Sequence, residues 1–154
     1  MFSFSKKKND DLLEQDDRER IVAAIRTVEA QTTGEIRVFV ESSCSYLDAL
    51  DRAKEIFAEL KMSNTERRNA VLVYVALDDQ QFAIFGDEQI YLKAGGPVFW
   101  EKAAGHLLEH FKESRIAEGI ASCVLELGNA LKHHFPYDPA VTKNELPDEI
   151  VFGK

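Results

Sequence analysis

Residues 70–77 read AVLVYVAL, an unbroken run of apolar residues in which valine recurs at alternate positions. Such a run is typical of a strand that helices cover on both faces. Upstream, residues 35–41 (EIRVFVE) alternate in polarity and are rich in β-branched residues, which predicts a second strand. Downstream, a turn at residues 78–80 precedes residues 81–85 (QFAIF), so we expect a short third strand that returns as a hairpin.

Apolar residues at helical spacing surround these strands. They predict helices over residues 10–30, 45–62, 97–111 and 115–134, the second of them with Ser45 at its amino-terminal cap. A helix that connects two strands of one sheet forms a right-handed crossover, which places the first two strands parallel. The sequence therefore predicts an α/β fold. We expect a three-layer α/β/α sandwich with a small mixed sheet of two parallel strands and one antiparallel hairpin strand, and helices on both faces.

The chain divides into three segments of unequal length. Residues 1–9 form a short amino-terminal tail, and residues 10–136 form the α/β domain. Residues 137–154 form a carboxyl-terminal tail, and residues 135–154 hold three of the four prolines of the chain. Because proline disfavours both helix and central strand, we expect this tail to be extended and packed on the domain.

The chain is acidic, with 27 aspartates and glutamates against 19 lysines and arginines and a formal net charge of −8. An acidic surface repels phosphate backbones and anionic lipids, which argues against nucleic acid or a membrane as partner. The first eight residues lack the apolar core of a secretion signal, and no apolar run approaches the roughly 20 residues that span a bilayer. Cys44 and Cys123 form no CxxC motif, which favours a reducing compartment but leaves one bridge between them open. We therefore expect a monomeric cytoplasmic protein whose macromolecular partner is an unidentified protein.

Several different short motifs follow one another along the chain. They are GEIRV at 34–38, Arg68-Asn69, FAIFGD at 82–87, Trp100, Phe111, Gly119, Gly128, Phe135-Pro136 and NELPDEI at 144–150. In order and spacing these motifs resemble the TPM domain family, and most closely its compact soluble branch. Ala70 and Gln89 depart from the family pattern, because glycine, which tolerates positive φ, is usual at both positions.

The resemblance implies an α/β/α sandwich, binding of a divalent cation and, for some members, an acid phosphatase activity. Roles of membrane-anchored or organellar members are not carried over, because the sequence shows neither a secretion signal nor an anchor. The chain also has no Cys-x5-Arg, Asp-x-Asp-x-Thr or Arg-His-Gly motif, so no phosphatase nucleophile is recognisable. A phosphatase of this kind would rely on a metal-bound water that carboxylates position.

Acidic residues gather at both ends of the predicted parallel strands. Carboxylates supply the hard oxygen ligands that Ca²⁺ and Mg²⁺ require. The candidate metal ligands are Asp87 and Glu35 at the edge where the parallel strands begin, and Asp78, Asp79 and Glu41 at the edge where they end. Both edges remain candidates for the metal site. Asp87, at the first edge, is the firmest motif match, whereas ligands in open α/β sheets usually bind beyond the carboxyl ends of strands, which favours the second edge. The structural alternative is that Asp78 and Asp79 form a turn and Asp87 caps a helix.

Residues 106–110 read HLLEH, which matches the H-x-x-E-H pattern of a class of zinc proteases. His106 and His110 are spaced to share a metal on one helix. The two intervening leucines belong to the apolar stripe of that helix, however, and five-residue motifs are frequent by chance. Helix packing is therefore the stronger interpretation.

Three function hypotheses remain. The first is a TPM-type binding or accessory domain that holds Ca²⁺ or Mg²⁺ through clustered carboxylates. The second, from a different class, is a weak metal-assisted acid phosphatase that uses Asp87, Glu35 and either Asp78 or Asp79. The third is a metal-free protein-interaction domain that uses its exposed tail.

Overall fold

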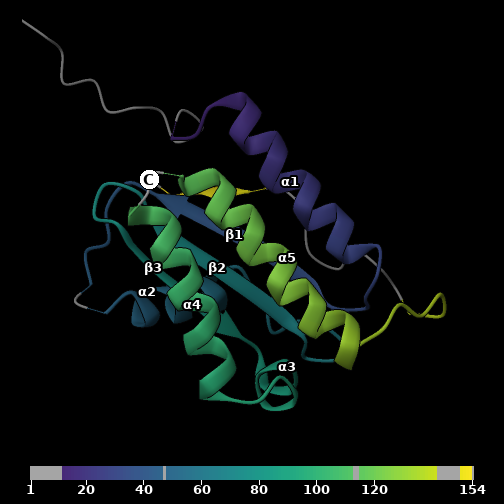
Figure 1. Ribbon diagram of the computed structural model, residues 1–154. Coiled ribbons are helices and arrows are strands. Elements are labelled where there is room, and N and C mark those ends of the chain that lie inside the picture. The colour runs from purple at the N-terminus through teal and green to yellow at the C-terminus, as the bar shows by residue number, and fades with distance from the viewer. Residues whose placement is uncertain (1–11, 47, 113–114, 142–149, 154) are drawn as a thin grey trace, which may run out of the picture.

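The fold is built on one four-stranded mixed sheet with the strand order β3-β2-β1-β4 (Figure 1). The computed structural model describes residues 12–46, 48–112, 115–141 and 150–153. In chain order, the elements are α1 (Gln15–Glu29), β1 (Glu35–Glu41), α2 (Ala49–Glu59), β2 (Ala70–Ala76), β3 (Gln81–Gly86), α3 (Glu88–Lys93), α4 (Pro97–Lys112), α5 (Ile116–His134) and β4 (Val151–Phe152).

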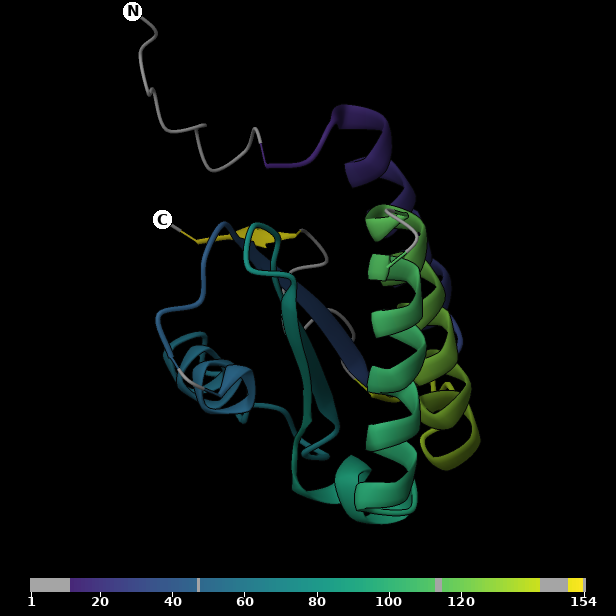
Figure 2. The ribbon, with the colours of Figure 1, turned by 60° about the vertical axis from the view of Figure 1, so that its left-hand side comes forward.

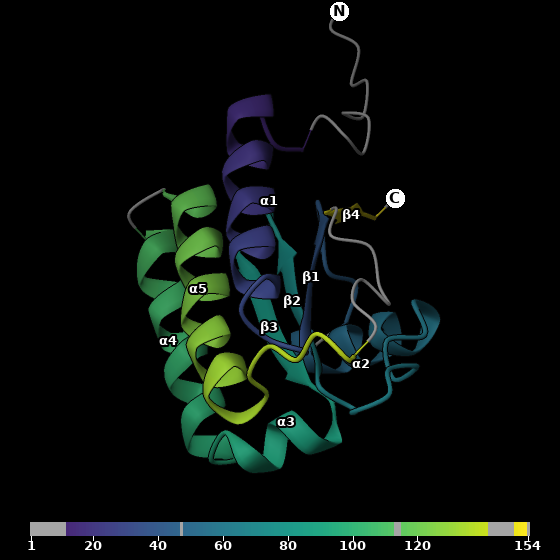
Figure 3. The ribbon, with the colours of Figure 1, turned by 90° about the vertical axis from the view of Figure 1, so that its right-hand side faces the viewer.

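The strand pairing confirms the predicted mixed sheet. β1 and β2 run parallel from the pair Glu35–Ala70 onward, and β2 and β3 form an antiparallel hairpin. β4, which was not predicted from the sequence, pairs parallel with β1 at Phe39 and Val151 (Figure 3). The Gly153 N–H continues this pairing with a 2.8 Å hydrogen bond to the carbonyl oxygen of Val40. The sheet therefore has one strand more than predicted.

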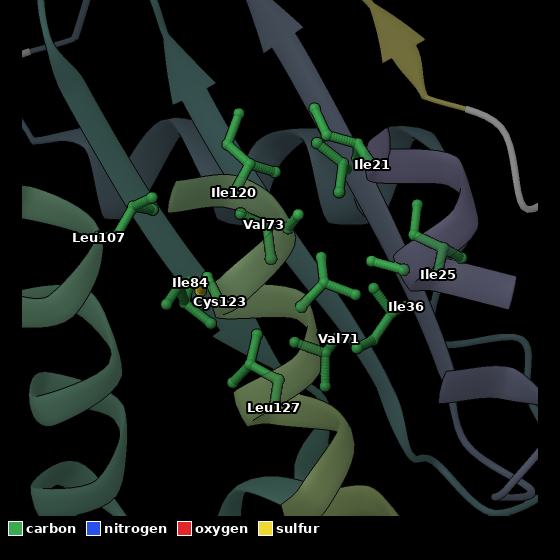
Figure 4. Packing of buried hydrophobic residues seen from close by; sticks show 14 of the residues in the cluster. Ile21, Ile25, Ile36, Val71, Val73, Ile84, Leu107, Ile120, Cys123 and Leu127 are labelled. Carbon is green, nitrogen blue, oxygen red and sulfur yellow. The ribbon is translucent and has the colours of Figure 1, made fainter. Parts of the chain in front are cut away.

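Helices cover both faces of the sheet, as predicted for a three-layer α/β/α sandwich (Figure 2). α2 lies on one face, where Ile56 and Phe57 pack on the side chains of Leu72 and Tyr74. α1, α4 and α5 lie on the other face, where the larger core cluster fills the layer between sheet and helices (Figure 4). That cluster includes Ile21, Ile25, Ile36, Val71, Val73, Ile84, Leu107, Ile120, Cys123 and Leu127. The alternation of β1 and β2 thus supplies two separate cores.

The two cysteines belong to different faces of the sheet. Cys123 is buried in the larger core, whereas the half-buried Cys44 packs against the core under α2. Both are free thiols, so the Cys44–Cys123 disulfide that the sequence left open is not formed. Burial raises the pKa of the Cys123 thiol to about 12, so it stays protonated as an apolar core residue.

Several helix boundaries differ from prediction. α2 is capped by Asp48 rather than Ser45, because the Asp48 carboxylate accepts the Leu50 N–H at 2.9 Å. The helix ends before the predicted position 62, since Lys61 adopts a left-handed φ of 55°. The short helix α3 is the helix that the alternative interpretation of Asp87 as a cap implied, although its bounds were not predicted. Among the described residues, no helix is both long and apolar enough to cross a membrane.

Candidate functional site

The first predicted acidic edge lies at the start of β1 and β2. Glu35 pairs with Ala70, and the Asp87 N–H donates to the Ala70 carbonyl oxygen at 2.9 Å, so the three residues form one row across the sheet. β2 lies between the two acidic residues, which places their backbones about 10 Å apart at the usual strand spacing. Glu35 and Asp87 thus lie at the same edge of the sheet, as expected, but a strand separates them.

The Asp87 carboxylate is engaged by an arginine and by a helix. Its two oxygens lie 2.8 Å from Nε and 2.8 Å from Nη2 of Arg68, and one of them also accepts the Glu88 N–H at 2.7 Å. Asp87 is buried and caps α3. This is the helix-capping role that the sequence offered as the alternative to metal binding. This hydrogen-bonded pair also raises the pKa of Arg68. A metal ion at Asp87 would have to replace the guanidinium.

The other groups of this edge are buried polar residues. Glu35 is 2% exposed, and Asn69 donates from Nδ2 to Thr33 Oγ1 at 3.3 Å. Burial lowers the pKa of Arg37, and the charges of Glu35 and Glu29 partly offset that effect. Glu35 therefore lies near a cation of its own strand, Arg37, and Arg37 also interacts with the charge of Glu29.

The second predicted edge holds an ion-pair network below α2. The two oxygens of Glu41 lie 2.9 Å from Nε and 3.0 Å from Nη2 of Arg52, and the hydroxyl of Tyr74 donates to the same carboxylate. Arg52 also donates to Glu55, which in turn accepts a hydrogen bond from Tyr46. Burial and the bond to Glu41 raise the pKa of Tyr74, so the phenol remains a donor at neutral pH. Glu41 is thus neutralised by a protein cation.

Asp78 and Asp79 are exposed and form the turn between β2 and β3. Asp79 Oδ2 accepts the Cys44 N–H at 2.7 Å, and the Asp78 N–H donates to the Ser42 carbonyl oxygen at 2.7 Å. These two bonds hold the turn against the loop that follows β1. Within the part of the chain that the structure describes, no three His, Cys, Asp or Glu side chains are grouped to hold a metal ion. The five predicted ligands therefore stay predictions, distributed over two edges.

The HLLEH segment lies on α4 and connects it to α5. Nδ1 of His106 is 2.7 Å from Glu126 Oε2, and Nδ1 of His110 is 3.0 Å from the His106 carbonyl oxygen. Leu107 between them is fully buried. The motif is accounted for by helix packing.

Sequence reasoning missed a groove along the outer edge of β3. It encloses about 710 Å³ and has one wall from α2 and another from α3 and α4. In Figure 2, β3 faces the viewer between α2 and α4. We call this the β3 groove, lined by Asp48, Leu50, Lys54, residues 82–88, Tyr91, Leu92, Pro97, Trp100, Glu101 and Ala104. No sequence signal indicated it, because only the structure shows that two leucines of its walls, Leu50 and Leu92, are exposed.

An aromatic cluster contributes Tyr91 and Trp100 to the groove wall formed by α3 and α4. Trp100 stacks on Tyr91 with ring centroids 6.0 Å apart, and Phe99 meets Trp100 edge-on at 5.1 Å. The Trp100 ring lies so close to Gly86 that a Cβ at that position would be 2.7 Å from Cη2. Gly86 is therefore required for close approach of the ring to the strand, whereas Ala70 and Gln89, which replace family glycines, do not have positive φ.

Comparison with known proteins gives one family and several solved structures. The TPM domain family matches residues 7–130 of the chain. The BA42 protein from the psychrophilic bacterium Bizionia argentinensis is 36% identical, and the match covers 96% of this chain and 100% of that protein with a TM-score of 0.84. A comparison with curated proteins gives no significant match.

Two more distant structures show the shared fold alone. The N-terminal domain of a protein from P. gingivalis is 18% identical, covers 82% of this chain and 83% of its own length, and has a TM-score of 0.63. The N-terminal domain of the cg2496 protein from Corynebacterium glutamicum is 15% identical, with 95% of each chain covered and a TM-score of 0.63.

Proposed function

This chain belongs to the TPM domain family, and from that premise we propose that it is a binding domain that takes an extended segment of a partner protein into the β3 groove. The proposal keeps the protein-interaction class that the sequence allowed. It moves the contact surface from the tail to the edge of the sheet.

The apolar walls of the β3 groove carry this proposal. Leu50 is 36% exposed on the α2 wall and Leu92 is 66% exposed on the opposite wall. Apolar surface left in water is unfavourable by about 25 cal/mol per Å², so two exposed leucines that flank one groove mark a surface that gains from being covered. An apolar concavity with a few polar groups at its rim is the usual form of a binding site.

The state of the predicted ligands supports a binding role over a metal-centred one. Asp87 and Glu41 each face an arginine in bidentate geometry. Removing either guanidinium from its partner would leave a buried carboxylate uncompensated, which is costly. The same carboxylates would have to position the metal-bound water of a phosphatase.

A peptide-display selection tests the proposal. Libraries of random peptides of about eight residues, long enough for one strand of usual length, are selected on the purified domain. We expect the enriched peptides to bind the wild-type protein and to lose binding to the double variant Leu50→Lys/Leu92→Lys. Both side chains are exposed, so the fold should be unchanged.

Leu125→Lys is the matched control, because Leu125 is 45% exposed on α5 and does not line the groove. It should bind the enriched peptides like the wild type. No enrichment, or equal binding by the groove variant, would contradict the proposed function.

A second candidate function is binding of a divalent cation at the carboxyl edge of the sheet. It is favoured by the two hydrogen bonds that fix the exposed Asp78-Asp79 turn against the loop after β1, because they hold the Asp79 carboxylate at the Cys44 N–H and the Asp78 backbone at the Ser42 carbonyl oxygen. Calorimetric titration of chelator-treated protein with CaCl₂ and MgCl₂ checks it. Heat that disappears in Asp78→Asn and Asp79→Asn supports the cation, and no heat in the wild type contradicts it.

A further inference from the structure

We infer, on the basis of the proposed function, that the partner segment joins the sheet as a fifth strand on the outer edge of β3, and that this segment is basic. Three features of the groove support it, namely the direction of the free backbone groups of β3, the space between the helices, and the charge of the rim.

The hydrogen bond between Asp87 and Ala70 determines which backbone groups of β3 are free. In an antiparallel pair, opposite residues alternate between those that exchange hydrogen bonds and those that do not. Since the Asp87 N–H bonds to Ala70, the register places Phe85 and Ala83 among the residues that bond to β2. The backbone N–H and C=O groups of Phe82, Ile84 and Gly86 therefore point away from β2, into the β3 groove.

This edge has the chemistry of a template for another strand. β3 is the last strand on its side of the sheet, and no described strand lies beyond it. Proteins commonly protect such an edge with charged residues, proline or a bulge. β3 reads QFAIFG, without a charge or a proline, and pairs with β2 at every position without a bulge. An extended peptide could add here through main-chain bonds, which is a common mode of peptide recognition.

The walls select a single strand rather than a second sheet. Leu50 and Lys54 of α2 stand on one side of β3, and Leu92 and Trp100 stand on the other. A second copy of this domain would bring its own α2 and α4 against these walls, because both helices flank its β3 as well. A single added strand carries no helices, and its side chains alternate between the two walls.

The charge of the rim indicates which side chains the added strand carries. The groove is lined by the carboxylates of Asp48, Glu88 and Glu101 against one ammonium group, that of Lys54. Arg68 neutralises the remaining carboxylate, Asp87, and its Nη1 also lies 3.8 Å from Glu88 Oε2, so these four carboxylates face two cations, Lys54 and Arg68. The excess of negative charge, on a chain of net charge −8, favours a segment with lysine or arginine beside apolar residues.

Backbone N-methylation of a selected peptide tests strand addition. The probe is the tightest binder from the display selection, synthesised with one N-methyl group at each position in turn. In a paired strand, alternate N–H groups donate to β3, so methylation there should weaken binding at least about tenfold. Methylation at the intervening positions should change affinity less than about twofold, because those groups face away from β3.

The outcomes separate this inference from the proposed function. A peptide that binds in the groove but shows no alternation in the methylation series would overturn strand addition and leave the binding function standing. Failure to obtain any groove-dependent peptide would overturn both. A concentration-dependent dimer that Leu50→Lys/Leu92→Lys dissolves would identify a second copy as the occupant and overturn the inference.

The charge of the segment has its own control. Glu88→Gln/Glu101→Gln should weaken the selected peptide severalfold at low salt, with the difference shrinking at high salt. The matched variant Glu59→Gln/Glu109→Gln changes the net charge equally at exposed positions outside the groove. Equal effects of the two variants, or enrichment of acidic peptides, would overturn the charge assignment.

Discussion

Replacing Arg52 by methionine removes the cation that neutralises Glu41 while it keeps a long side chain. In the folded protein two charge-assisted hydrogen bonds, of 2.9 and 3.0 Å, join Arg52 to Glu41. The Glu41 side chain is 5% exposed and that of Arg52 is 19% exposed. After the substitution the carboxylate keeps the Tyr74 hydroxyl and a small access to water.

The magnitude follows from this burial. Removing one partner of a buried ion pair costs about 3–5 kcal/mol. Because Arg52 is about one-fifth exposed, water can partly replace it, and we expect a loss of about 2–3 kcal/mol in the free energy of unfolding. For a domain of this size that corresponds to a decrease in Tm of about 5–10 °C. Glu41→Gln should cost less, about 1–2 kcal/mol, since the amide can still accept from Tyr74.

Urea denaturation of the two single variants and the double variant gives the coupling energy. We expect a value of at least about 1 kcal/mol, as for residues that share a hydrogen-bond network. Arg20→Met, at an exposed position of α1, is the control and should lie within about 0.5 kcal/mol of the wild type. If Arg52→Met matches that control and the coupling is zero, Glu41 is not held by Arg52, and its carboxylate is available to a metal ion.

The remaining predictions concern acid stability, helix packing and hydrolysis. The Tyr46 hydrogen bond, assisted by Arg52, lowers the pKa of Glu55, so its contribution to stability is present above the ordinary pKa and is lost as the pH falls through the folded value. Glu55→Gln should therefore be destabilised at pH 7 and approach the wild type in acid, and a difference that grows in acid would be the wrong sign. Gly128→Ala should cost about 1 kcal/mol, because the new Cβ would lie 2.3 Å from Val28 Cγ2 and overpacking outweighs the gain in helix propensity. Gly105→Ala, with no atom within 4 Å of its Cβ, should stabilise the protein by about 0.5–1 kcal/mol. Both changes in the free energy of unfolding are measured by urea denaturation. If the two variants change it in the same direction, the packing of α1 on α5 is contradicted. In a p-nitrophenyl phosphate assay with Mg²⁺ or Ca²⁺, we expect the wild type to show no more turnover than Asp79→Asn, and metal-dependent turnover lost in that variant would favour the phosphatase alternative.

The sequence predicted those parts of the fold that local patterns determine. The apolar run at 70–77 indicated a strand covered on both faces, and all seven residues of β2 are indeed buried. β4 has only two residues, too few for any periodicity, and its place beside β1 depends on tertiary pairing. The cap of α2 was placed three residues early because both Ser45 and Asp48 suit that position, and only the backbone geometry distinguishes them.

The site was less accessible to sequence reasoning, since its contacts are between distant residues. Asp87 was recognised as a possible helix cap, and it is one. Its pairing with Arg68, nineteen positions away, follows no local rule, nor does the pairing of Glu41 with Arg52. The β3 groove arises from the way α2 and α4 flank an edge strand. A sequence shows that a hairpin strand is short and uncharged, but not that it lies at an open edge.

Amide hydrogen exchange at β3 tests the binding account most directly. In the free domain, the Ile84 N–H faces the groove and should exchange much faster than the N–H of Ala83, which bonds to β2. Saturation with a selected peptide should slow exchange at Ile84 at least about tenfold and leave Ala83 nearly unchanged. A bound peptide that leaves Ile84 as fast as in the free protein would contradict the addition of a strand at this edge.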